Sequence, residues 1–165
     1  MTLQEEIYQW HKRNYPNDDA NISLLSLMEE FGELCRTHVK QAGGIRGTSE
    51  FWQKEKFKEL GDVFIALMNY ASHVGEVVSI DDTFAYSSGL EQGRLLAYIG
   101  WRIGTLAPDA PACTIEACDV WYSLSCYCYA EGRDPVEVFK ERWETISQRD
   151  YVANPETGGR ERENV

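Results

Sequence analysis

The sequence predicts an all-α protein that forms one domain. Apolar residues recur every three or four positions in six segments, and no stretch alternates with period two for long enough to predict a strand. Prolines and a glycine pair stand at the ends of these segments. With 165 residues, 43% of them hydrophobic, the chain is long enough to bury a core.

The first three helices have the clearest limits. The N-terminal helix is closed from outside by Pro16. Asn21 is a suitable N-cap for a second helix over 22–41, which the pair Gly43-Gly44 ends. A third helix follows over about 50–73, and its continuous apolar run predicts burial on nearly all sides.

The second half of the chain is predicted to hold three more helices. After an irregular connection over 74–89, a fourth helix spans 90–106 and a fifth spans about 114–130. A sixth spans 135–149, with Pro135 well placed in its first turn.

We therefore expect a single domain over residues 1–153 and a flexible tail over 154–165. The third and fifth helices align at an offset of 57 residues, and the match is best over 59–64. This similarity indicates an internal repeat. Its first half, about 1–75, carries the acidic residues described below, and its second half, about 89–150, is degenerate.

The charge of the chain argues against nucleic acid as a partner. With 16 Lys and Arg against 27 Asp and Glu, the net charge is −11, and a polyanion would repel it. The first residues lack the basic and apolar regions of a signal peptide, and no apolar run is long enough to span a membrane. Five cysteines without a C-x-x-C pair suit a reducing compartment. We expect a cytoplasmic protein without membrane or nucleic-acid partners.

Four acidic residues stand out by their spacing. Glu30 and Glu33 are three residues apart on the second helix, and Glu59 and Asp62 are three apart on the third, so each pair projects from one side of its helix. Each pair borders an apolar stripe, where four carboxylates would repel one another unless a cation offset their charge. Hard divalent ions such as Mg²⁺ prefer carboxylate oxygens. The alternative, for either pair alone, is an ordinary solvated helix flank.

The same residues resemble a known family. The segments Glu29-Glu30-Phe31-Gly32-Glu33 and Glu59-Leu60-Gly61-Asp62, separated by 25 residues, are similar to the E-E-x-x-E and E-x-x-D signature of the MazG-like, all-α nucleoside triphosphate pyrophosphohydrolases. This family includes the dimeric dUTPases. The close resemblance spans about 22–71, and 134–149 is similar to the family's last helix.

The resemblance implies a four-helix-bundle module that hydrolyses a nucleoside triphosphate to the monophosphate and pyrophosphate. It implies that Mg²⁺ or Mn²⁺ is held by Glu30, Glu33, Glu59 and Asp62, and that the chain forms a homodimer or homotetramer. Glu29 is left as an outer base or supporting residue, because its helical phase points away from the core.

The resemblance also implies three substrate-binding residues, namely Lys58, Asn69 and Arg149. For Lys58 and Arg149 the alternative is a cation that simply solvates its helix or faces the helix dipole. Aromatic side chains near the acidic helices suit base stacking or, more often, the core: Trp52, Tyr98 and Trp101.

The second half lacks a complete acidic set. Glu116 and Asp119 match the acid pair of the third helix, but Tyr98 and Trp101 stand where the facing helix would need its two acids. We therefore expect Glu116 and Asp119 to be vestigial or structural, with one active site in each chain.

The expected substrate is a deoxynucleotide, with a purine such as dGTP or dATP favoured. The alternatives are a pyrimidine pyrophosphatase of the dUTPase or dCTPase type and a non-catalytic helical module that binds nucleotide or metal. Other chemistries find no support, because no Glu-x-x-His, H-E-x-x-H, P-loop or G-x-S-x-G motif is present.

Overall fold

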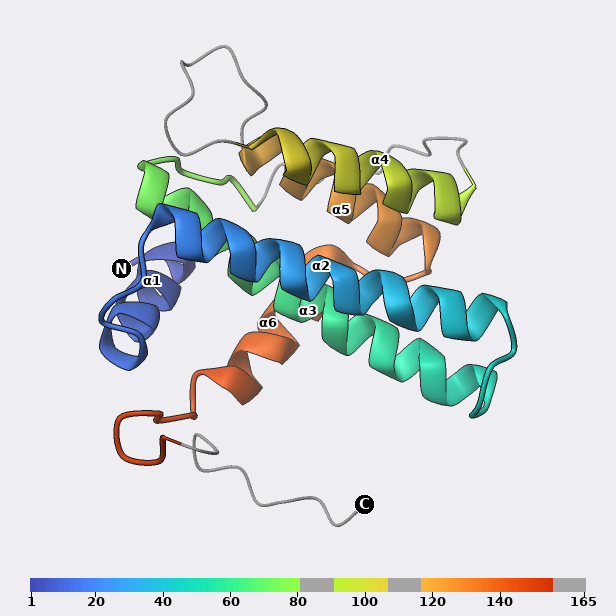
Figure 1. The fold of residues 1–165 in the computed structure, drawn as a ribbon, viewed down its shortest axis with the longest axis horizontal. Coiled ribbons are helices and arrows are strands. Elements are labelled where there is room, and N and C mark those ends of the chain that lie inside the picture. The colour runs from blue at the N-terminus through green and yellow to red at the C-terminus, as the bar shows by residue number, and fades with distance from the viewer. Residues whose placement is uncertain (81–90, 107–116, 156–165) are drawn as a thin grey trace.

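The computed structural model describes residues 1–80, 91–106 and 117–155 (Figure 1). All regular secondary structure within these ranges is helical, which confirms that the fold is all-α there. The helices are α1 (Leu3–Asn14), α2 (Ala20–Ala42), α3 (Ser49–Val74), α4 (Gln92–Thr105), α5 (Ala117–Ala130) and α6 (Pro135–Ile146). None of these helices is long and apolar enough to cross a membrane.

The start of α2 differs from the prediction. Asp19, and not Asn21, is the N-cap, because its Oδ1 accepts hydrogen bonds of 2.9 Å from the backbone N–H groups of both Asn21 and Ile22. Asn21 is thus one of the residues whose N–H is capped. The helix begins two residues earlier than predicted as a result.

The ends of α3 and α6 illustrate one correct and one wrong boundary. Gly75 follows α3 in the left-handed conformation with φ 78°, the usual C-terminal signal. Helix α6 ends at Ile146, so Arg149 lies beyond the helix that was expected to contain it. Beyond the helix, the backbone carbonyl of Arg149 accepts a hydrogen bond of 3.0 Å from Trp10 Nε1, which ties this segment to α1.

Some predictions fall outside the described residues. These are most of the connection over 74–89, the first residues of the fourth and fifth helices, Cys113, Glu116 and the tail beyond residue 155. Cys35, Cys126 and Cys128 are free thiols, as expected.

Helix α3 is the centre of the fold. It packs side by side with α2 and also contacts α1, α5 and α6, while α4 packs against α5 and α2 (Figure 1). Its residues from Val63 to Ala71 are all buried, as the apolar run predicted. Phe64 links three helices, because its ring lies 4.5 Å from Trp121 on α5 and 6.2 Å from Phe139 on α6.

Gly61 allows α6 to approach α3 closely. A Cβ atom at this position would lie only 2.5 Å from Cβ of Arg142 and 2.8 Å from its Cγ. Any larger residue would therefore push the two helices apart. The close approach brings the Arg142 side chain beside the acidic residues of α3.

Candidate functional site

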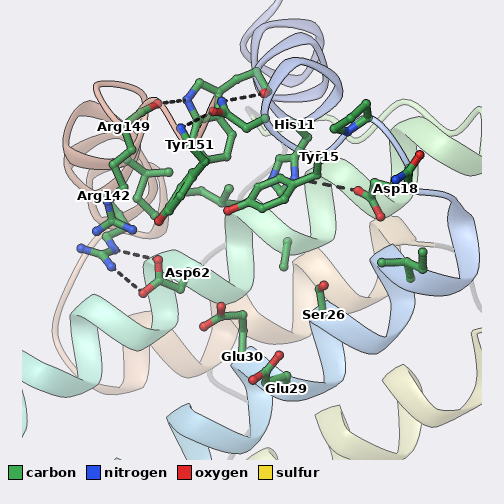
Figure 2. Close-up of a pocket in the computed structure, with 18 of the residues that line it drawn as sticks. His11, Tyr15, Asp18, Ser26, Glu29, Glu30, Asp62, Arg142, Arg149 and Tyr151 are labelled. Atoms are coloured by element: carbon green, nitrogen blue, oxygen red, sulfur yellow. Dashed lines mark hydrogen bonds and ion pairs between the residues drawn. The ribbon is translucent and has the colours of Figure 1, made fainter. Parts of the chain in front are cut away.

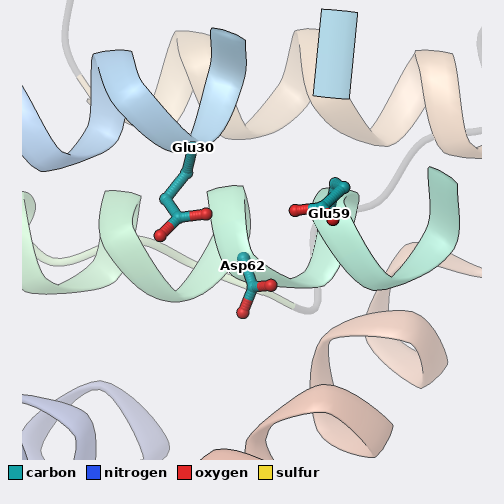
Figure 3. A group of neighbouring side chains, drawn as sticks. All are labelled: Glu30, Glu59 and Asp62. Atoms are coloured by element: carbon teal, nitrogen blue, oxygen red, sulfur yellow. The ribbon is translucent and has the colours of Figure 1, made fainter. Parts of the chain in front are cut away.

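Three carboxylates from two helices meet beside α3. Glu30 comes from α2, and Glu59 and Asp62 come from α3 (Figure 3). One oxygen of each lies within 4.8 Å of the others. Glu59 is only 8% exposed, and the other two residues are partly buried. The structure therefore brings together three of the four acids that the sequence singled out.

Glu33, the fourth acid, does not join this group. It lies one turn further along α2, where its carboxylate forms an ion pair with Arg36 of the same helix. The side chain is about one-third exposed. A neighbouring cation three residues away gives Glu33 a local partner, which the E-x-x-E spacing alone could not reveal.

Cations offset two of the three clustered carboxylates. Arg142 donates two hydrogen bonds to Asp62, of 2.7 Å from Nε and 2.8 Å from Nη2 (Figure 2). Lys58 Nζ lies 3.1 Å from Oε1 of Glu59. Among the described residues, no Lys, Arg or His forms an ion pair with Glu30.

The pKa of Glu30 responds to this imbalance. It is raised from an ordinary value of 4.5 to about 7, mostly by burial and also by the negative charges of Asp62, Glu59 and Glu29, while Arg142 opposes the shift. At neutral pH the cluster therefore carries more negative charge than nearby cations offset. Added positive charge beside Glu30 would favour its ionised form.

A cavity of about 680 Å³ opens beside the acidic group (Figure 2). Glu30 and Asp62 line one end of it, together with Glu29. The opposite end is lined by α1 and by the segments that follow α1 and α6. The cavity thus has an acidic end and an opposite end that carries aromatic side chains.

Aromatic rings gather at that second end. Tyr15 lies 5.6 Å from His11 and 5.5 Å from Tyr151 between ring centroids, and both pairs are tilted by about 40°. Trp10 lies 6.0 Å from Tyr15 and packs edge-on against it. All four residues line the cavity. They offer flat apolar surfaces on which a planar ligand could stack.

Asp18 lines the same end and is the most buried acid there, with a side chain only 5% exposed. Its Oδ2 accepts hydrogen bonds from Asn69 Nδ2 at 2.7 Å and from Ser23 Oγ at 3.0 Å. It also lies 3.4 Å from His73 Nε2 and 3.9 Å from His11 Nδ1. Burial, opposed by Asp18, lowers the pKa of His11 to about 4, so this ring is neutral at pH 7.

The three predicted substrate-binding residues have different positions. Lys58 and Arg149 line the cavity, and the Lys58 side chain is 41% exposed. Asn69 does not line it, because it is buried behind Asp18. Lys56 does not line the cavity, since it is buried and forms an ion pair of 2.8 Å with Glu131, the residue that follows α5.

The aromatic residues named from the sequence are not at the cavity. Trp52, Tyr98 and Trp101 do not line it. Nor are Tyr98 and Trp101 in the core, since Trp101 is 57% exposed, so the expectation of core positions is wrong for both. Asp119 forms an ion pair of 3.0 Å with Arg102, which agrees with a structural role.

Sequence analysis missed several cavity residues. Arg142 lies in the segment that resembles the family's last helix, but nothing in its spacing distinguished it from its charged neighbours. Asp18 lies in the segment between α1 and α2, and its burial depends in part on contacts with Asn69 and His73, more than fifty residues away. Long-range packing of this kind leaves no local signal.

The chain matches no protein-family model, no curated protein and no solved structure.

Proposed function

We propose that this protein is a metal-dependent nucleoside triphosphate pyrophosphohydrolase. It would convert a nucleoside triphosphate and water to the nucleoside monophosphate and pyrophosphate. The observation that supports this proposal most directly is the group of Glu30, Glu59 and Asp62, of which Glu30 and Asp62 line one end of a cavity of about 680 Å³. A cavity of this size suits a small organic ligand.

The donor set fits Mg²⁺ or Mn²⁺. Carboxylates are hard oxygen ligands, and three of them with oxygens within 4.8 Å of one another suit one divalent ion. Glu30, Glu59 and Asp62 would hold the ion, and Glu33 is proposed as a further ligand on the family resemblance. The chemistry that such an ion supplies is neutralisation of the triphosphate charge and acidification of water.

The residues of the cavity have roles that suit phosphate chemistry. Lys58, Arg142 and Arg149 line it and provide cationic donors for phosphate oxygens. Glu29 also lines it, is exposed, and is proposed to accept a proton from the attacking water. The aromatic end would hold the nucleoside and exclude water from it.

We also propose that the chain assembles as a homodimer or homotetramer. Large apolar side chains are exposed on α2, where Leu25 is 65% exposed and Met28 47% exposed, and on α4, where Trp101 is 57% exposed. Exposed apolar residues of this kind are typical of a surface that associates with another protein. Size-exclusion chromatography with light scattering would test this proposal.

The reaction can be tested directly. The protein is incubated with Mg²⁺ or Mn²⁺ and each of the eight common nucleoside and deoxynucleoside triphosphates plus dUTP, and products are separated by ion exchange. We expect monophosphate and pyrophosphate, without orthophosphate, from a subset of bases. A deoxypurine substrate is proposed, and dUTP or dCTP as sole substrate would instead support the pyrimidine alternative.

Two variants make the test specific. Glu59→Gln should abolish turnover while leaving the helical circular dichroism spectrum unchanged. Glu141→Gln removes an exposed carboxylate on α6 and should leave turnover unchanged. Nucleotide binding that EDTA abolishes, without product from any nucleotide, would reject the enzyme and favour a binding module. Turnover retained in Glu59→Gln would reject the carboxylate assignment.

A further inference from the structure

One oxygen of Asp18 lacks a partner although the side chain is almost completely buried. The two hydrogen bonds to this carboxylate both go to Oδ2, from Asn69 and Ser23. Its Oδ1 has no hydrogen-bond partner among the described residues. A buried acceptor left unpaired is costly, and such atoms in proteins are normally satisfied by water, an ion or a ligand.

This carboxylate belongs to the aromatic end of the cavity. Figure 2 shows Asp18 near His11 and Tyr15, apart from Glu30 and Asp62 at the acidic end. Asp18 directly precedes the cap of α2, and Glu30 lies ten residues after Ala20, the first residue of that helix. At 1.5 Å per residue, the two ends of the cavity are about 15 Å apart along α2. An extended nucleotide can bridge such a span from its base to its phosphates.

We propose that the aromatic end is a nucleobase subsite in which Oδ1 of Asp18 accepts a hydrogen bond from the amino group of the base. The subsite takes adenine, guanine or cytosine and rejects uracil and thymine. This inference rests on the proposed function for the nature of the ligand, and it assigns the specificity of the same cavity.

The chemistry of the carboxylate decides this preference. An ionised Asp has acceptors only, so it requires a donor on the ligand. Adenine, guanine and cytosine each carry an exocyclic amino group. Uracil and thymine carry one ring N–H between two carbonyl oxygens, and those oxygens would face the negative charge of Asp18. Leaving a buried acceptor unpaired is the penalty by which polar sites reject analogues that lack a donor.

The aromatic rings provide affinity without choosing among bases. Every base has a flat face, so stacking on Tyr15 or Tyr151 tolerates all of them. Asn69 and Ser23 hold Oδ2 and thereby fix the carboxylate, so they act as positioning residues. Asp18 is then the residue that distinguishes the bases.

The test measures binding of nucleoside monophosphates to the full chain by isothermal titration calorimetry in the presence of EDTA. Three matched pairs isolate the amino group: dCMP against dUMP, dAMP against dIMP, and dGMP against dIMP. We expect the amino-bearing member to bind at least tenfold more tightly in one or more pairs. No metal or turnover is needed, so a failure of this subsite is distinguishable from a failure of the proposed reaction.

Variants assign the preference to one atom. Asp18→Asn keeps an oxygen for Asn69 and Ser23 but can turn an amide N–H toward the cavity, so the preference should vanish or invert. Asp19→Asn removes the same charge one residue away, outside the cavity, and keeps a good helix cap. It should leave the preference unchanged.

Tyr15→Leu provides a second check if Asp18→Asn fails to fold. It removes a stacking ring, so it should weaken both members of each pair by a similar factor and preserve their ratio. Affinities within twofold in all three pairs of the wild type would overturn the proposal. So would an absence of monophosphate binding at millimolar concentration, or a preference that survives in Asp18→Asn.

Discussion

Arg142 and Asp62 form a bidentate ion pair that joins α6 to α3, with hydrogen bonds of 2.7 and 2.8 Å between residues 80 positions apart. Both side chains are nearly nine-tenths buried. The same carboxylate belongs to the acidic group beside the cavity. One guanidinium therefore has two effects, because it holds the last helix in place and offsets part of the negative charge of the site.

Replacing Arg142 by Ala should destabilise the fold strongly. The change leaves Asp62 largely buried beside Glu30 and Glu59 without its cation, a situation that typically costs roughly 3 kcal/mol. Urea unfolding at neutral pH in EDTA measures the loss. Glu141→Gln breaks the exposed pair with Arg133 on the same helix and should cost less than about 1 kcal/mol. Equal losses in the two variants would mean that the Arg142 pair contributes no more than a surface contact.

Gly61→Ala should also destabilise the protein, for a steric reason. The new Cβ would lie 2.5 Å from Cβ of Arg142 and 3.4 Å from the carbonyl oxygen of Val138, so α6 must move. Overpacking of this kind costs roughly 1–3 kcal/mol. Gly32→Ala is the control, since its Cβ would have no neighbour within 4 Å inside α2. It should stabilise the helix by about 0.5–1 kcal/mol. Thermal unfolding of both variants measures these effects. If Gly61→Ala stabilised the protein as much as Gly32→Ala, the close approach of α6 to α3 would be contradicted.

Local sequence patterns predicted the helices well, because apolar periodicity and helix caps act within a few residues. The buried run of α3 was recognised in this way, and so was the end of α2 at Gly43. The errors occurred where two signals compete. Asp19 and Asn21 both suit a cap, and only the backbone path decides for Asp19.

The site was predictable to the extent that helix spacing determines it. Glu30, Glu59 and Asp62 meet because pairs on facing helices share a side, which the sequence displays. The burial of Asp18 was not predictable, because it depends on contacts between distant residues. Asn69 was expected at the substrate and instead supports Asp18 from behind.

The stability of the metal-free protein should carry the signature of Glu30. Its pKa is about 7 in the folded protein and 4.5 ordinarily, so between these values the folded state binds more protons than the unfolded state. The contribution of Glu30 to the free energy of unfolding therefore falls as pH rises from about 4.5 to 7. Glu30→Gln should be more stable than the wild type at pH 8 in EDTA, with the advantage shrinking toward pH 4. Urea unfolding across this range measures the difference.

The wild type must be compared with Glu30→Gln because His11 changes the pH dependence of the free energy of unfolding in the opposite direction. Its pKa falls from 6.5 to about 4 on folding, so the folded state binds fewer protons over that window and stability rises with pH. The two contributions partly cancel in the wild type. Subtracting the Glu30→Gln curve from the wild-type curve removes the His11 contribution, which both proteins share. Parallel curves from pH 4 to 8 would contradict the raised pKa of Glu30.

Glu33 provides the sharpest test of the metal proposal, because its carboxylate is paired with Arg36 and lies outside the acidic group. A partly exposed ion pair contributes at most about 1 kcal/mol, so a bound divalent ion can draw Glu33 away at little cost. If Glu33 is a ligand, Arg36→Gln should tighten Mn²⁺ binding by up to about fivefold, and Glu33→Gln should weaken it by roughly tenfold or more. Isothermal titration calorimetry with Mn²⁺ measures both effects. The double variant separates ligation from general charge, since the gain from Arg36→Gln should disappear when Glu33 is already Gln. A gain that persists in the double variant would mean that Arg36 acts only through its charge and that Glu33 is not a ligand.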